Sequence, residues 1–367
     1  MTDVVFVLVV ALRLLIPLGI PKFPLPLILA ALVIDGVDQT IFQAVGADGV
    51  LANYQDYDKA LDVYYLTIAY TSTLRNWLDP FAVGVARGLF YYRLAGTLAF
   101  ELSGARPLLI VFPNTFEYFF IFYETVRLFW NPSRMSHRTV VGAAAAIWVF
   151  VKLPQEYWIH IAELDVTDQQ ARHPWLVPGF FAALAVVLAG LWQLRGRLPP
   201  RDRRPHADVD ACIDRPAGAA VTPRRDMAAI LSMAVAEKVL LLTTIAVIFS
   251  RVLDGVRASA FELAFGVTAV VVLNSAISLV PFERGSRYGS TAIQFAAMGI
   301  VNAAIVGAGV LVRRTAGVDA YLDVTDALFY LLLITLIITM YDRYRVIGNL
   351  STDKRRVPRL RLRVRRA

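Results

Sequence analysis

Charged residues are scarce in this chain of 367 residues, because Asp, Glu, Lys and Arg make up 18% of it while hydrophobic residues make up 57%. A soluble globular domain usually has about a quarter charged residues. The chain has a single cysteine, Cys212, which excludes a disulfide-rich scaffold. These absences leave an all-α, polytopic membrane protein as the predicted class, since long runs rich in Leu, Phe and Ala favour membrane helices.

The sequence motifs of several enzyme classes are also missing. The chain contains no Gly-rich phosphate loop ending in Lys-Ser/Thr, no Gly-x-Ser-x-Gly and no Cys-x-x-Cys. Nucleotide-driven pumping, elbow-serine hydrolysis and thiol redox chemistry therefore lose their usual support. Four histidines are too few for a histidine-rich membrane metalloenzyme. No cofactor is expected, and the sequence leaves open whether the protein is an enzyme.

Long apolar segments are abundant, and a helix needs roughly 20 such residues to cross the hydrocarbon core. The sequence predicts about eleven spans, or ten if the first lies at the interface, because Arg13 and Pro17 interrupt it. The predicted spans are 3–20, 25–47, 60–77, 80–102, 107–130, 139–160, 175–194, 227–250, 260–281, 291–312 and 322–341.

Basic residues gather in two segments, with eight arginines in 195–225 and nine in the tail from residue 343 onward. The positive-inside rule places both in the cytoplasm and the N-terminus outside the plasma membrane. Four units follow: an N-terminal membrane half (1–194), a basic linker (195–225), a C-terminal packing half (226–345) and a basic tail (346–367).

The net charge of +8 follows from these basic segments. We expect residues 195–225 and 354–366 to bind anionic lipid headgroups. Nucleic acid is the disfavoured alternative partner. The expected ligand is a small solute or a lipid-linked molecule.

Polar residues in the early spans form helical stripes. Asp35, Asp38 and Gln39 fall at i, i+3 and i+4, and Asn114 and Glu117 form a second stripe directly after Pro113. Further candidates at the same end of these spans are Asp62, Arg93, Lys152, Glu156 and His160. Because ionisable groups in hydrocarbon usually face the bundle interior, we expect a polar cavity near the extracytoplasmic leaflet.

In this cavity Arg93, Lys152 and Lys59 are expected to neutralise the carboxylates. The alternative is a set of structural ion pairs and residues that extend to the interface. Asp35 and Asp38 are weak candidates for a carboxylate Mg²⁺ site. The spacing of Glu156 and His160 suits interfacial hydrogen bonding, a proton relay or a metal.

Glu117 lies in the aromatic stretch 116–122. Such stretches usually pack against other helices or face lipid, and the alternative is an apolar wall around a carboxyl group that carries protons. Three functions remain open: a proton-linked transporter of a small polar or amphiphilic solute, a membrane enzyme with a lipid-linked or extracytoplasmic substrate, and a non-catalytic assembly subunit.

Overall fold

The computed structural model describes residues 2–44, 48–160, 233–252, 295–304 and 324–353, with isolated residues between 175 and 209 and at 307 and 315. In this part of the chain every long element is a helix, so the all-α prediction is confirmed. None of the helices described there combines the length and apolarity that a membrane crossing requires. The predicted span 260–281 lies outside the described residues, as do parts of 175–194 and 291–312.

The first four helices are α1 (Thr2–Leu18), α2 (Pro24–Ala44), α3 (Asp48–Asn76) and α4 (Pro80–Ser103). The start of α4 follows from its sequence, because the Asp79 side chain accepts a hydrogen bond from the Phe81 N–H and Pro80 occupies the first helical position. The same helix ends at Gly104, whose φ of 68° is the left-handed conformation that glycine adopts readily.

The predicted span 107–130 is broken into α5 (Pro107–Val111) and α6 (Thr115–Phe129). Pro113 cannot donate a backbone hydrogen bond, so the helix stops rather than bends. Side chains of α4 satisfy the carbonyl groups left free: Tyr92 Oη donates to Val111 O at 2.7 Å, and Arg93 Nη1 donates to Phe112 O at 3.1 Å.

The predicted span 139–160 is also irregular. It consists of α7 (His137–Ile147), a π-helical segment (Trp148–Lys152) and α8 (Leu153–His160). Ser136 caps α7 by accepting a hydrogen bond from the Thr139 N–H. A π-helical turn changes the direction of the side chains that follow it, and Lys152 at its end is buried.

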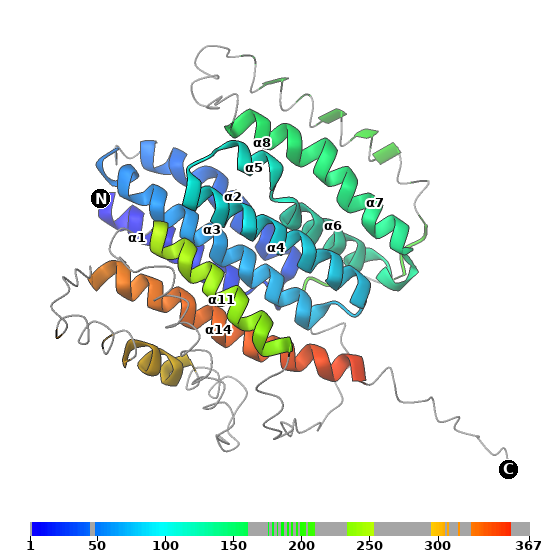
Figure 1. Ribbon diagram of the computed structural model, residues 1–367. Coiled ribbons are helices and arrows are strands. Elements are labelled where there is room, and N and C mark those ends of the chain that lie inside the picture. Colours follow the sequence, from blue (N-terminus) through cyan, green and yellow to red (C-terminus); the bar gives the residue numbers. More distant parts are fainter. Residues whose placement is uncertain are drawn as a thin grey trace.

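Helix α3 lies at the centre of the arrangement (Figure 1), where it packs against α1, α2, α4, α11 (Met233–Val252) and α14 (Val324–Asp353). Helix α6 packs against α2, α4 and α7. In Figure 1, α7 and α8 run along one side of the bundle and α14 along the opposite side. Helices α3 and α6 both carry polar groups that are considered below.

Candidate functional site

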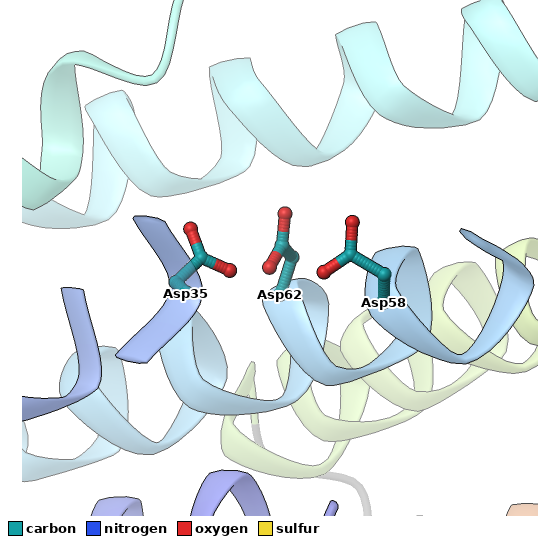
Figure 2. Close-up of side chains that lie close together, drawn as sticks. All are labelled: Asp35, Asp58 and Asp62. Atoms are coloured by element: carbon teal, nitrogen blue, oxygen red, sulfur yellow. The ribbon is translucent and has the colours of Figure 1, made fainter. Parts of the chain in front are cut away.

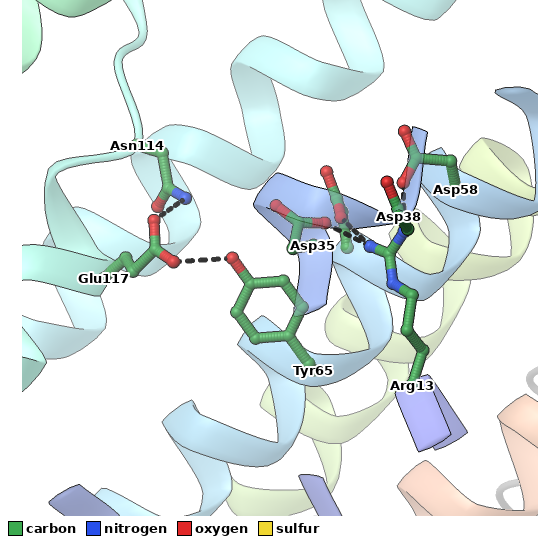
Figure 3. A network of polar contacts seen from close by, with 8 residues as sticks. Arg13, Asp35, Asp38, Asp58, Tyr65, Asn114 and Glu117 are labelled. Atoms are coloured by element: carbon green, nitrogen blue, oxygen red, sulfur yellow. Dashed lines mark hydrogen bonds and ion pairs between the residues drawn. The ribbon is translucent and has the colours of Figure 1, made fainter. Parts of the chain in front are cut away.

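One guanidinium group joins four carboxylates from two other helices (Figure 3). Arg13 Nη1 donates to Asp38 Oδ2 at 2.5 Å and to Asp58, and Arg13 Nη2 donates to Asp62 Oδ1 at 2.6 Å and to Asp35. The Arg13 side chain is only 3% exposed. These five residues are called the aspartate cluster.

Helical periodicity explains how the cluster forms. Asp35 and Asp38 are three residues apart on α2, and Asp58 and Asp62 are four apart on α3, so each pair lies on one face of its helix. Helices α1, α2 and α3 pack against one another. Arg13 of α1 therefore reaches both pairs at once.

The aspartate cluster has more negative than positive charge. Four carboxylates surround one guanidinium, which leaves a formal excess of three negative charges when all are ionised. Asp38 is buried, whereas Asp35, Asp58 and Asp62 are partly exposed. Figure 2 shows these last three side by side, and each offers an oxygen within 4.8 Å of the others. Such a group of oxygens can accept a proton or bind a cation.

A second group of polar side chains surrounds Glu117 of α6. Tyr65 Oη donates to Glu117 Oε1 at 2.7 Å, and Asn114 Nδ2 donates to Glu117 Oε2 at 3.0 Å. The ammonium group of Lys152 lies 3.6 Å from Glu117 Oε2. Glu156 accepts a hydrogen bond from the Asn114 backbone N–H at 3.2 Å. These five residues, all buried, are called the glutamate cluster.

Arg93 lies at the edge of the glutamate cluster, with its Nη1 atom 4.0 Å from Glu156 Oε1. A small cavity of about 10 Å³ lies beside it and is lined by Arg93 and Asn114, among others. The Oδ1 atom of Asn114 has no hydrogen-bond partner within the described part of the chain. Because a space of this size is close to the minimum that holds one water molecule, a bound water can complete the contacts of Asn114.

Tyr65 connects the two clusters. It lies three residues after Asp62 on α3, so the two side chains are one helical turn apart. Figure 3 shows the Tyr65 ring between Glu117 and the aspartates that surround Arg13. The carboxyl and hydroxyl groups of α2, α3 and α6 that can exchange protons therefore lie close to one another.

The structure thus distributes the residues predicted from the sequence over two adjacent clusters. Asp35, Asp38 and Asp62 lie in the aspartate cluster; Asn114, Glu117, Lys152 and Glu156 lie in the glutamate cluster, with Arg93 at its edge. The side chains of Gln39 and His160 lie outside the described residues.

Of the three cations expected to neutralise the carboxylates, Lys152 and Arg93 lie beside Glu117 and Glu156, whereas Lys59 lies elsewhere. Lys59 does not pair with the aspartates: its ammonium group lies 3.7 Å from Glu101 Oε1 on α4. Lys152 pairs with Glu117, and the cation that contacts all four aspartates is Arg13. Arg13 interrupts an apolar segment of the sequence, and a lone arginine in such a segment is itself a signal that carboxylates lie nearby.

Two further polar contacts involve Trp77, which directly follows α3, and Tyr70 of α3. Trp77 Nε1 donates to Glu124 Oε1 at 2.7 Å, and Arg127 Nε lies 3.1 Å from Glu124 Oε2. Tyr70 Oη donates to Glu237 Oε1 at 2.5 Å, and Arg87 Nε lies 3.2 Å from the same oxygen. The second contact joins α3 and α4 to α11.

Searches against protein-family models, curated proteins and solved structures found no match for this chain. Its chemistry is therefore inferred from the geometry of the two clusters.

Proposed function

We propose that the chain is a multi-pass membrane protein that moves a small polar or amphiphilic solute together with protons. The observation that carries the proposal is the aspartate cluster, in which four carboxylates share one buried arginine. These carboxyl groups share one counter-charge and lie close together, so they offer neighbouring sites that can accept and donate a proton. Proton-linked transport needs such groups.

The distribution of apolar and charged side chains supports the membrane part of the proposal. Large apolar side chains face outward on several helices; Phe150 is 78% exposed and Val4 is 70% exposed. Charged side chains such as Arg13, Glu117 and Lys152 are buried between the helices. Buried charged groups together with exposed large apolar side chains are uncommon in water, and a bilayer would cover the outward apolar faces.

The contact between Tyr65 and Glu117 supports the proton-linked part. A tyrosine hydroxyl both donates and accepts a hydrogen bond, so it can pass a proton between neighbouring carboxylates. Tyr65 lies one turn from Asp62 and holds Glu117 at 2.7 Å. The proposed path therefore starts at the partly exposed aspartates and reaches Glu117 through Tyr65.

The test uses the protein in liposomes that contain a pH-sensitive dye and are exposed to an inward proton gradient. Solutes with carboxylate, phosphate and amine groups are added in turn, and we expect at least one to accelerate acidification of the interior. Glu117→Gln should abolish this acceleration, whereas Glu101→Gln should retain it because Glu101 pairs with Lys59 outside both clusters. Acceleration by none of the solutes, or equal acceleration in Glu117→Gln, would contradict the proposal.

A second candidate function is a membrane enzyme that uses a divalent cation. The observation that favours it is the mutual approach of the Asp35, Asp58 and Asp62 oxygens to within 4.8 Å. Mg²⁺ prefers carboxylate oxygens but would have to displace Arg13 from them. Calorimetric titration with MgCl₂ distinguishes the two functions: the enzyme requires binding that Asp62→Asn weakens, whereas proton-linked transport requires none.

A further inference from the structure

A cavity of about 580 Å³ lies away from both clusters, between the end of α3, the start of α2 and the last turns of α6. Its volume falls within the range of roughly 300–1,000 Å³ that is typical of small-molecule sites. Helix α6 separates it from the glutamate cluster, because Glu117 and the cavity-lining Glu124 are two helical turns apart. It is therefore a different site from the one described above.

Apolar and polar groups both line the cavity. The apolar part includes Leu25, Leu128 and Met135. The polar part includes the side chains of Arg127 and two histidines, His137 and His206. A ligand that fits this lining has an apolar body and one polar end.

The acidic groups of the lining already have partners. Glu124 accepts a hydrogen bond from Trp77 at one oxygen and contacts Arg127 with the other. Asp79 accepts a hydrogen bond from the Phe81 N–H at the start of α4. These carboxylates hold the walls of the cavity in place, so they are poor sites for a cationic ligand.

The basic groups, in contrast, keep donors available. Arg127 is fixed by its contact with Glu124 and by donation from Nη1 to Asn76 O at 2.8 Å. Its other terminal nitrogen, Nη2, has no partner within the described ranges. The His137 ring is held by stacking on Phe81 at 3.9 Å between centroids, and neither His137 nor His206 has a hydrogen-bonded ring nitrogen there.

One wall of the cavity comes from residues 205–209, which lie between two anchored points. On one side, Asp202 accepts hydrogen bonds from the Asn131 N–H at 3.0 Å and from Arg134 Nη1 at 2.7 Å. On the other side, the Val209 N–H donates to Lys22 O at 3.0 Å. Because both sides are fixed, His206 is held at the cavity together with Arg127.

We infer that this cavity binds a small amphipathic anion, with its carboxylate or phosphate group on Arg127, His137 and His206 and its apolar body against Leu25, Leu128 and Met135. A planar guanidinium that is already held in place is well suited to a carboxylate or phosphate. The inference goes beyond the proposed function, since it needs neither proton movement nor the two clusters.

The test compares three molecules that share one apolar body and differ in the end group: 3-phenylpropionate, 3-phenylpropanol and 3-phenylpropylamine. Binding to the full chain in nanodiscs of zwitterionic lipid is measured by calorimetry without a pH gradient. We expect 3-phenylpropionate to bind at least tenfold more tightly than the other two. Equal binding of the alcohol would overturn the inference, because the anionic group would then contribute nothing.

Variants locate the site. The double variant Glu124→Gln/Arg127→Gln removes a charge pair together and should weaken binding of 3-phenylpropionate at least tenfold. His206→Gln changes an exposed residue, so it should weaken binding severalfold and tests the site even if the double variant fails to fold. Arg138→Gln removes an exposed arginine that does not line the cavity and should change binding less than twofold. Unchanged binding in His206→Gln and in a folded double variant would overturn the inference.

One further comparison distinguishes a free anion from a lipid headgroup as the ligand, and a second distinguishes anion binding from the proposed proton-linked transport. Phosphatidylglycerol added to the nanodiscs should change binding of 3-phenylpropionate less than twofold; loss of binding would show that a lipid headgroup occupies the cavity instead. Glu117→Gln should bind 3-phenylpropionate as the unmodified protein does. A loss of proton flux with intact binding, or the reverse, shows which of the two proposals fails.

Discussion

Replacement of Arg13 by glutamine takes the positive charge out of the aspartate cluster. The substitution removes the guanidinium that contacts Asp35, Asp38, Asp58 and Asp62 and leaves these four carboxylates together. Removing one member of a buried ion pair typically costs about 3–5 kcal/mol, because the remaining charge is uncompensated. Arg13 is 3% exposed and Asp38 is 1% exposed, so this buried range applies to the Arg13–Asp38 contact.

We therefore expect Arg13→Gln to lower the free energy of unfolding by about 3–5 kcal/mol. The assay is reversible unfolding in mixed micelles, followed by circular dichroism. Lys59→Gln is the matched control, because Lys59 also pairs with a carboxylate but its side chain is 45% exposed. Exposed pairs contribute about 0–1 kcal/mol, so the control should stay within about 1 kcal/mol of the unmodified protein.

A double variant tests the reason for this effect. Asp38→Asn in the Arg13→Gln background removes one of the uncompensated carboxylates and should recover at least about 1 kcal/mol, within the range of coupling between contacting residues. A cost below about 1 kcal/mol for Arg13→Gln would refute the reasoning, as would the absence of recovery in the double variant. A full recovery of stability without any proton flux would instead favour an assembly subunit whose charges are internal pairs.

Two other predictions concern packing and a buried hydrogen bond. A methyl group at Gly96 of α4 would collide with Phe112, so Gly96→Ala should lower the free energy of unfolding by about 1–3 kcal/mol. The control is Gly88→Ala on the same helix, where the methyl group meets open space. This variant should raise the free energy of unfolding by about 0.5–1 kcal/mol. Equal effects of the two alanines in mixed-micelle unfolding would contradict the packing of α4 on Phe112. Trp77→Phe removes the indole hydrogen bond to buried Glu124 and should cost about 1.5–3 kcal/mol. Its control is Trp130→Phe, which removes an exposed indole hydrogen bond to Pro199 O and should cost about 0.5–1 kcal/mol in the same assay; similar costs would contradict the role of Glu124.

The helices of the first half could be predicted because their ends are local features. The predicted span 80–102 differs by one residue from α4 (Pro80–Ser103), since Asp79, Pro80 and Gly104 mark its ends. The breaks inside 107–130 and 139–160 were harder to predict. Pro113 lies at the first break, but no residue type marks the π-helical turn before Lys152.

The sequence predicted which residues belong to the candidate site better than it predicted which side chains they contact. Helical spacing placed Asp35 with Asp38 and Asn114 with Glu117 on shared faces, because that information lies within one helix. Which helices pack together depends on the whole fold. For this reason the sequence predicted Lys59 as one of the cations of the cavity and did not predict Arg13, which α1 brings to the aspartates.

Access of polar and apolar reagents to spin labels tests the central claim, that apolar faces point into a bilayer while the carboxylates occupy a hydrated interior. Labels are attached to Phe150→Cys and Asp62→Cys in a Cys212→Ser background, and relaxation by oxygen and by a water-soluble nickel complex is measured in liposomes. We expect oxygen to relax the label at position 150 more strongly and the nickel complex to relax the label at position 62 more strongly. Equal access of nickel to both labels would contradict the central claim.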